Sequence, residues 1–357
     1  LGSDTLTAQY IKGKKTVLGK KKITKREDRR GKFLQIIGAD ENNLQKIDVD
    51  IPENFLTVVC GVSGSGKSTL VDTVIYPYLA NRLMHAKRDT GKVRNIKGTG
   101  LFDSIYYVDQ SPIGTSSRSN PATFIGVFDD IRKIYAMLGE SKKRGYSANR
   151  FSFNSKEGRC EKCQGLGTIK VEMHFMPDIY IICDICQGKR YKKDTLEVQI
   201  RNKDISDILD MTFGEAEEFF TNYPHVKRKM SIMNRVGLEY LKLGQPAPTL
   251  SGGEAQRLKI AFELGKKSAG KTLYILDEPT SGLHFHDISK LLYVIRDLVS
   301  MGNTLIIIEH NTAVIKSADY IVELGPGGGD EGGNVVFQGF IGDFLNAKTA
   351  TAKCLRE

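Results

Sequence analysis

A glycine-rich segment that begins at residue 61 has the residue types and spacing of a phosphate-binding loop. The segment Gly61-Val-Ser-Gly-Ser-Gly-Lys-Ser matches the pattern G-x4-G-K-[ST], in which glycines let successive backbone N–H groups face phosphate oxygens. It lies between an apolar run that ends at Cys60 and a stretch with helical periodicity, as this chemistry requires. We expect Lys67 to reach the β- and γ-phosphates of a nucleotide and Ser68 to ligate Mg2+. The predicted nucleotide-binding residues of this loop are Gly61, Gly64, Gly66, Lys67, Ser68 and Thr69.

Two carboxylates stand at the end of an apolar segment in the second half of the chain. The run LYILDEP places Asp277 and Glu278 directly after its apolar residues, and α/β sheets bind ligands at the carboxyl ends of such strands. Asp277 is predicted to complete the Mg2+ shell, and Glu278 to orient the attacking water. An isolated Asp-Glu pair is usually a surface turn, so this assignment depends on the phosphate-binding loop.

Two more polar residues follow apolar runs in the same way. His310 ends the run TLIIIEH and is a candidate sensor of the γ-phosphate, while Gln110 follows IYYVD. A single histidine at a strand end is more often a core or surface group. His310 and Gln110 are therefore assigned to the nucleotide site only because the other motifs of that site are also present.

A second phosphate-contacting segment is predicted at Leu250-Ser-Gly-Gly-Glu. Ser251 and Glu254 form the S-x-x-E pattern of a capping box, which begins an amphipathic helix. Gly252 and Gly253 leave the first backbone amides of that helix uncovered and available to an anion. The alternative interpretation is a capped helix with no ligand.

Four of the six cysteines have the spacing of a structural zinc site. They form two C-x2-C pairs separated by 19 residues, and each pair is followed by a glycine that permits a tight turn. Four thiolates close a tetrahedral site, so the predicted Zn2+ is structural and not catalytic. His174 lies on the polar face of an alternating stretch over 169–175, and we expect a surface residue there rather than a ligand. The predicted metal ligands are Cys160, Cys163, Cys183 and Cys186; Cys60 and Cys354 are assigned no chemistry.

Basic residues gather around the cysteine pairs and at the start of the chain. Between residues 140 and 193 there are twelve Lys and Arg against six Asp and Glu, with aromatic residues between them. Such a mixture can bind phosphates and stack on bases, although charge runs are often only solvated surface. Residues 1–32 carry eleven basic residues against three acids, which favours a solvated linker over a polyanion-binding tail. The candidate nucleic-acid-contacting residues near the cysteines are Lys142, Lys143, Arg144, Arg150, Arg159, Lys189 and Arg190.

Length and composition limit the class of protein. The chain has 357 residues, of which 40% are hydrophobic and 26% charged, with a net charge of +10. These values exclude a disulfide-stapled peptide and a disordered chain, and they are typical of two or three globular domains. The sequence contains neither an apolar run of membrane-spanning length nor the apolar core of a signal peptide, so we expect a cytoplasmic protein without a membrane partner. The first residue is Leu, and the arm resembles an inter-domain linker, so we expect a fragment of a larger protein.

The motifs must be positioned by alternating strands and helices. Short strands are expected over 33–39, 44–52 and 55–62, as at the antiparallel edge of a mixed sheet, followed by a helix over 70–84 that Pro77 kinks or ends. After residue 250, helices over 254–267 and 287–300 alternate with strands over 273–276 and 304–308, and further strands follow over 320–324 and 335–339. This order predicts an α/β fold with a mostly parallel, buried sheet. The basic, cysteine-containing segment between the two halves is expected to be an inserted domain.

The phosphate loop, Gln110, LSGGE, the Asp-Glu pair and His310 occur in the order found in the ATP-binding cassette (ABC) family, which this chain resembles across its catalytic core. In that family the LSGGE helix caps ATP bound to a second cassette. The chain has one copy of each motif, so the resemblance implies a homodimer or a partner cassette. Ser251 and Gly253 would then reach the partner's nucleotide.

A cassette interrupted by a four-cysteine module also resembles the UvrA family of bacterial nucleotide excision repair, specifically its second cassette. The most specific stretches are DQSPIG, RSNPATF, RFSFN, GRCEKCQG, KVEMHFMPD, LGQPAPTLSGGEAQRLK and LDEPTSGLHFHD, and the segment GPGGGDEGG resembles the family too. The resemblance implies a P-loop ABC-type ATPase domain with an inserted signature domain that carries the zinc module. The expected parts are a basic linker or end of a preceding domain (1–32), the first ATPase part (33–88), the inserted DNA-binding domain (89–250, zinc module near 150–195), the signature helix with the second ATPase part (251–345) and a tail (346–357).

This second resemblance implies a function as well. The family surveys duplex DNA as a dimer, senses lesions, loads UvrB and leaves under control of ATP hydrolysis, with ATP, Mg2+ and Zn2+ as cofactors. Arg118 in the RSN stretch would line the DNA path, whereas the UvrB-docking half is absent. Thr115 and Ser117 stand near positions where the family commonly has Arg and Pro, which leaves open a paralogue in drug self-resistance. A DNA-binding half that does not hydrolyse ATP alone is the other alternative.

Overall fold

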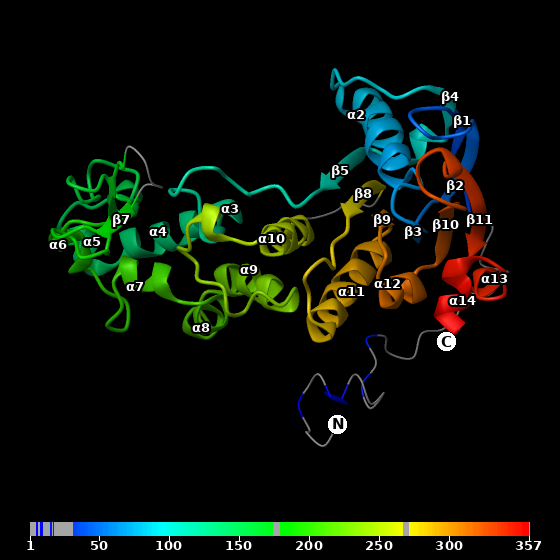
Figure 1. The fold of residues 1–357 in the computed structure, drawn as a ribbon. Helices are drawn as coiled ribbons and strands as arrows, with labels where there is room; N and C mark the ends of the chain where they lie inside the picture. Colours follow the sequence, from blue (N-terminus) through cyan, green and yellow to red (C-terminus); the bar gives the residue numbers. More distant parts are fainter. Residues whose placement is uncertain are drawn as a thin grey trace. The chain divides into compact units, whose positions relative to one another are not determined.

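The computed structural model describes residues 5, 8–9, 15, 17, 31–173, 179–266 and 271–356. The chain forms two compact units (Figure 1): unit 1 comprises residues 1–110 with 266–357, and unit 2 comprises residues 111–265. Most of the predicted basic arm and His174 lie outside the described residues. None of the helices in the described ranges is long and apolar enough to cross a membrane.

Unit 1 is built on a six-stranded sheet in the order β11-β10-β3-β9-β8-β5. Five strands are parallel, and β11 at the edge is antiparallel to β10. The parallel strands are rich in Val, Ile and Leu because both faces of such a sheet are covered, and β3, β9 and β10 are almost completely buried. This confirms the predicted parallel α/β sheet. The strands are β3 (Leu56–Gly61), β5 (Ser104–Val108), β8 (Thr272–Asp277), β9 (Thr304–Ile308), β10 (Tyr320–Gly325) and β11 (Asn334–Phe340).

A second sheet of unit 1 has three antiparallel strands in the order β2-β1-β4, which are β1 (Phe33–Ala39), β2 (Ile47–Pro52) and β4 (Val93–Lys97). We expected the strands over 33–39, 44–52 and 55–62 at one sheet edge; instead β3 lies inside the large sheet. The burial patterns give the reason, since β1 and β2 are covered mainly on one face and β3 on both.

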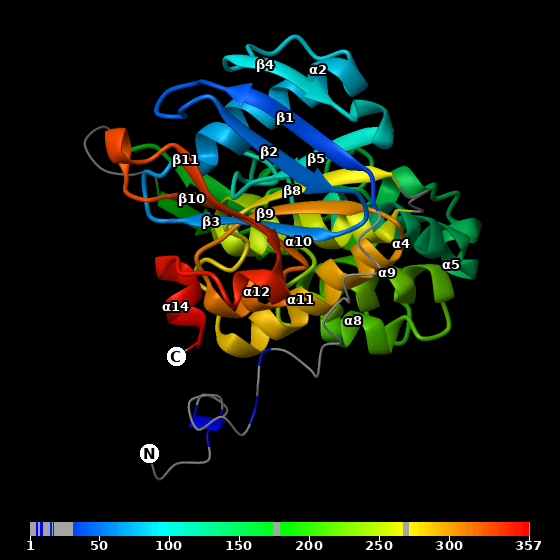
Figure 2. The same ribbon diagram turned by 90° about the vertical axis from the view of Figure 1, so that its right-hand side faces the viewer.

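Helices complete unit 1 on the two faces of the large sheet. Figure 2 shows α11 (Phe285–Ser300), α12 (Thr312–Ser317) and α14 (Ala350–Arg356) on one face, and α2 (Tyr76–Met84) with the small sheet on the other. The predicted helix over 70–84 is a π-helical segment, Thr69–Ile75, that continues as α2. Pro77 has no N–H for the carbonyl of Thr73, which accepts a bond from Gly91 N at 2.9 Å instead. The shorter elements are η3 (Thr99–Leu101), η6 (Gly329–Glu331) and α13 (Ile341–Phe344).

Unit 2 is mainly helical and contains one hairpin, β6 (Thr168–Val171) with β7 (Ile179–Ile182). Unit 2 spans residues 111–265, whereas the expected inserted domain spans 89–250. It begins later because β4 and β5 pair within the sheets of unit 1. It ends later because α10 (Gly252–Gly265) packs on α9 (Pro224–Arg235). The predicted strand over 169–175 corresponds to β6, which ends at Val171, and residues 174–175 lie outside the described residues. The other elements are α3 (Pro121–Phe124), α4 (Val127–Met137), α5 (Gly139–Lys143), η4 (Ala148–Phe151), α6 (Lys193–Leu196), α7 (Ile205–Asp210), α8 (Phe213–Phe219) and η5 (Ala247–Thr249).

Candidate nucleotide and metal sites

The phosphate-binding loop joins β3 to the π-helical segment, as the motif predicts. Gly61 has φ +136°, and a Cβ there would lie 2.1 Å from the carbonyl oxygen of Leu324, so only glycine fits. The Lys67 side chain is 6% exposed, and its Nζ donates to the carbonyls of Gly61 at 3.1 Å and Val62 at 2.8 Å. The loop therefore encloses one buried ammonium group in its curve.

The outer carbonyls of this loop are satisfied by a second glycine-rich segment, GPGGGDEGG at residues 325–333, for which the sequence predicted a family resemblance but no role. Gly329 N donates to Gly64 O at 3.0 Å, and Gly333 N donates to Ser65 O at 3.1 Å. Asn43 Nδ2 bridges the two segments by donating to the carbonyls of Gly64 at 2.9 Å and Gly329 at 3.1 Å. The glycine repeat is a visible signal for such close backbone packing. These bonds hold the loop from its outer side.

The predicted carboxylates, Gln110 and His310 all follow strands that end at the same sheet edge. The register pairs Val59 with Ile308, Leu276 with Ile307 and Val108 with Leu276. Glu278 Oε1 lies 3.7 Å from His310 Nε2, and both side chains are 47% exposed. The fold of unit 1 thus brings the catalytic candidates Lys67, Glu278, His310 and Gln110, together with Asp277, to one edge.

The electrostatics of this edge favour a divalent cation. Burial raises the pKa of Asp277, and the neighbouring carboxylates of Glu278, Asp109 and Glu309 raise it further. Burial also raises the pKa of Asp72 to about 6, although a hydrogen bond with Tyr107 opposes the change. Carboxylates that repel one another in a half-buried place are stabilised by a hard cation such as Mg2+.

We expect Asp72→Asn to stabilise the protein at high pH but not at low pH. The folded-state pKa of Asp72, about 6, exceeds its ordinary value of 3.8, so the native state prefers the protonated acid. Its stabilising effect is complete below pH 3.8 and is lost as the pH rises through 6. The gain from Asn should be about 1–2 kcal/mol at pH 8, after allowance for solvent screening, and near zero at pH 4. Urea unfolding without Mg2+ measures it, with the exposed Asp103→Asn as control; an equal gain at both pH values would contradict this cause.

The LSGGE segment begins α10 in unit 2 with the predicted capping box. Ser251 N and Oγ donate to Glu254 Oε2 at 2.8 and 2.9 Å, and Glu254 N donates to Ser251 Oγ at 3.3 Å. Two supports were not predicted. Tyr240 OH donates to Glu254 Oε1 at 2.8 Å, and Arg257, 4% exposed, donates from Nη1 to Gly237 O at 3.0 Å. These bonds fix the helix start, where Gly252 and Gly253 lie.

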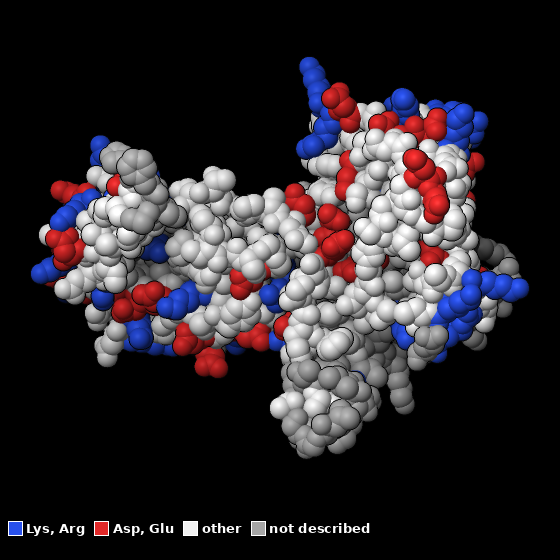
Figure 3. All heavy atoms as spheres, in the orientation of Figure 1, with Lys and Arg blue, Asp and Glu red and all other residues white. Residues whose placement is uncertain are grey.

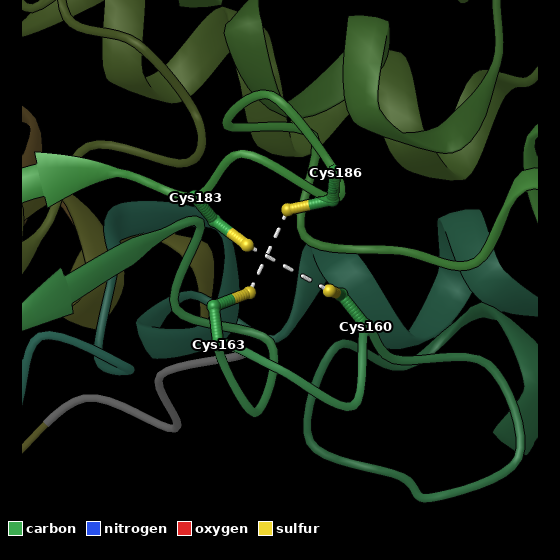
Figure 4. Close-up of side chains that lie close together, drawn as sticks. All are labelled: Cys160, Cys163, Cys183 and Cys186. Atoms are coloured by element: carbon green, nitrogen blue, oxygen red, sulfur yellow. Dashed lines mark hydrogen bonds between the residues drawn. The ribbon is translucent and has the colours of Figure 1, made fainter.

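The four predicted cysteines of unit 2 meet at one point (Figure 4). Their sulfurs all lie within 4.8 Å of one another, with Cys160 to Cys183 at 4.0 Å and Cys163 to Cys186 at 3.6 Å. A tetrahedral ion bound at about 2.3 Å would separate its sulfur ligands by about 3.8 Å. All four thiols are free and buried. The donor set therefore fits a four-coordinate thiophilic metal.

The predicted DNA-contacting arginines near this cluster have partners within unit 2. Arg118 Nη2 donates to Gln164 O at 3.1 Å, and Arg190 Nη2 donates to Gly244 O at 3.0 Å. Arg159 binds the side chain of Gln164, Arg150 pairs with Asp194, and Arg144 pairs with Glu140 and Glu197. These bonds brace the metal module.

The predicted lysines differ in their pairing. Lys189 Nζ lies 2.8 Å from Asp204 Oδ2, whereas Lys142 and Lys143 are exposed and form no ion pair with a described residue. Figure 3 shows acidic and basic side chains interleaved on this unit. Lys142 and Lys143, at the end of α5, therefore keep unpaired charge for an outside anion.

Comparison with known proteins gives concordant matches. The chain is 53% identical over 335 residues to UvrABC system protein A of Thermus thermophilus, which covers 94% of this chain and 35% of that protein. It is 52% identical over 354 residues to UvrABC system protein A of Methanothermobacter thermautotrophicus, covering 99% and 36%. The crystal structure of UvrA2 from Deinococcus radiodurans matches with a TM-score of 0.89 and 42% identity over 99% of this chain and 42% of that chain. No protein-family model matches. The chain spans little more than a third of the length of these curated relatives.

Proposed function

We propose that this chain, which belongs to the UvrA family, is the second ABC-type ATPase cassette of a protein that recognises DNA damage in nucleotide excision repair. The observation that carries the proposal is one sheet edge that holds Lys67, Asp277, Glu278 and His310, together with a separate LSGGE helix start and a four-cysteine cluster. We further propose that the protein is cytoplasmic.

In ATP hydrolysis the phosphate loop binds the nucleotide, and the residues at the strand ends contact Mg2+ and the attacking water. ATP with Mg2+ supplies the transferable phosphoryl group and the charge neutralisation it needs. Lys67 would hold the β- and γ-phosphates, and Ser68 and Asp277 would ligate Mg2+. Glu278 orients water and accepts its proton. His310, 3.7 Å from Glu278, senses the γ-phosphate.

Hydrolysis requires a second cassette in this proposal, because in the ABC family, which the chain resembles, the LSGGE helix caps ATP bound to a second cassette, and the chain has one copy of each motif. Ser251 and Gly253 then cap the nucleotide of a second copy or of a partner cassette. Specific ATPase activity should then rise with protein concentration if the chain associates with itself. We further propose that the whole protein engages a UvrB-type partner.

We propose that the four cysteines hold a structural Zn2+ that stiffens a DNA-contacting surface. A damage sensor that tests how the duplex bends needs phosphate contacts more than base contacts. Exposed lysines on a rigid module provide these contacts. Arg150 and Arg190, paired within unit 2, keep the module in shape.

We expect Lys142→Ala with Lys143→Ala to weaken DNA binding equally for damaged and undamaged duplexes. Each lost phosphate contact removes about one from the slope of log affinity against log salt, so the double variant should lower the slope by about 1–2. Fluorescence anisotropy across a salt series measures both. Lys316→Ala, an exposed lysine of unit 1, is the control. An unchanged slope would remove these lysines from the DNA surface.

The experiment that tests the function compares binding to a duplex with and without one bulky lesion, at several salt concentrations and with or without ATP and Mg2+. A lesion preference that ATP modulates supports damage recognition. Equal affinity for both duplexes under every condition would contradict damage sensing by this chain.

A further inference from the structure

We propose that Glu309 is the positioning residue that sets Glu278 and His310 at their mutual distance, a role that rests on the proposed ATPase function. Glu309 follows β9 directly and precedes His310 in sequence. No sequence motif marks Glu309, because a single acid before a histidine matches no spacing rule.

The Glu309 carboxylate joins two loops through four hydrogen bonds. Its Oε1 accepts from Thr280 N at 2.9 Å and from Thr280 Oγ1 at 2.5 Å. Its Oε2 accepts from His310 N at 2.9 Å and from Asn311 N at 3.0 Å. Oε1 therefore accepts hydrogen bonds from the loop after β8, and Oε2 accepts them from the loop after β9.

Burial makes these bonds hard to replace. Glu309 is 3% exposed and Thr280 is 6% exposed. A buried carboxylate is tolerated when donors satisfy both oxygens, and loss of the charge leaves those donors without an equivalent acceptor. Water does not readily substitute at such a place.

The two loops that Glu309 joins carry the reacting groups. Thr280 lies two residues after Glu278, whose backbone N donates to Ile308 O at 3.0 Å. Glu278 has φ +42°, a backbone conformation that a non-glycine residue keeps only where its surroundings fix it. On the other side, Asn311 Oδ1 accepts from Ala313 N and begins α12. Glu309 thus connects a strained Glu278 turn to a firmly anchored His310 segment.

The first test measures ATP turnover and nucleotide affinity separately. Glu309→Gln should lower kcat by about 10-fold or more, because small displacements of catalytic groups are costly, while affinity for a fluorescent ATP analogue changes less than about 3-fold, since the phosphate loop has other supports. Thr280→Val, which removes one hydroxyl, should lower kcat in the same direction, and Thr280→Ser should retain it. Turnover near the wild-type value in Glu309→Gln, or equal losses of kcat and affinity, would overturn the role.

The second test needs neither turnover nor nucleotide, and so separates failure of this role from failure of the proposed function. In histidine-labelled protein, the His310 imidazole NMR signals, assigned with His310→Asn, should move in Glu278→Gln and also in Glu309→Gln and Thr280→Val. They should stay in place in Thr280→Ser. Unmoved signals in folded Glu309→Gln and Thr280→Val proteins would overturn the proposal, whereas a protein that moves them but binds no ATP would refute only the ATPase function.

Discussion

Lys67→Ala should abolish ATP turnover and weaken nucleotide binding more than any other single change in unit 1. The Lys67 ammonium is enclosed by the loop and donates to the carbonyls of Gly61 and Val62. Burial lowers its pKa, while the neighbouring Glu278 carboxylate raises it. Alanine would remove the one cation inside the loop, among the described residues, that can neutralise phosphate charge.

The expected size follows from the value of electrostatic groups in enclosed sites. Loss of one such group typically costs about 100–1,000-fold in kcat, and we expect at least the lower figure for Lys67→Ala. Steady-state ATPase assays with saturating Mg2+ measure it, and Lys67→Arg tests whether charge alone is sufficient. Lys316→Ala should behave as wild type. Turnover in Lys67→Ala within about 2-fold of wild type would contradict the nucleotide site.

Replacement of one cluster thiol should have the largest effect on unit 2. Cys163→Ser should abolish binding of one Zn2+ per chain and unfold the module around β6 and β7. Four sulfurs replace the apolar core that these short segments lack, as Ile179 to Ile182 are all exposed. Structural zinc contributes on the order of 10 kcal/mol to small domains, more than such a module can lose.

Metal analysis and limited proteolysis measure this result. Cys163→Ser should lose the metal and become sensitive to protease between residues 155 and 195, and a strong chelator should produce the same cleavage in wild type. Cys354→Ser, at an exposed cysteine, is the matched control and should keep both metal and resistance. Protease resistance in metal-free Cys163→Ser would show that packing alone holds the module.

Local patterns were sufficient to predict the elements that carry each motif. Glycine spacing and a flanking apolar strand predicted the phosphate loop, and S-x-x-E predicted the cap at Ser251, because both features depend on residues close in sequence. Two C-x2-C pairs predicted the cysteine cluster although 19 residues separate them, because four thiols at this spacing are typical of one structural metal site. The apolar runs of β8, β9 and β10 were equally clear, since buried parallel strands need few polar residues.

Long-range pairing was not predictable in the same way. Sequence alone placed β1, β2 and β3 at one edge, whereas packing separates them into two sheets. The arginines near the cysteines had the composition of a DNA surface, but Arg144 and Arg150 form ion pairs within unit 2. Charge composition does not distinguish a paired arginine from a free one, because the partner is chosen by the fold.

The sequence by itself determined which chemical groups this protein has: a lysine in a glycine loop, carboxylates after apolar strands, a capped LSGGE helix and four thiols at metal-binding spacing. Only the tertiary structure decided how they are held. Asn43, Glu309 and the segment 325–333 hold the loops that carry the lysine and the carboxylates, through contacts between residues far apart in the chain. A backbone carbonyl or a buried carboxylate accepts bonds from any donor that the fold brings near, so the glycine repeat indicates close packing but no spacing rule reveals which residues these supports contact.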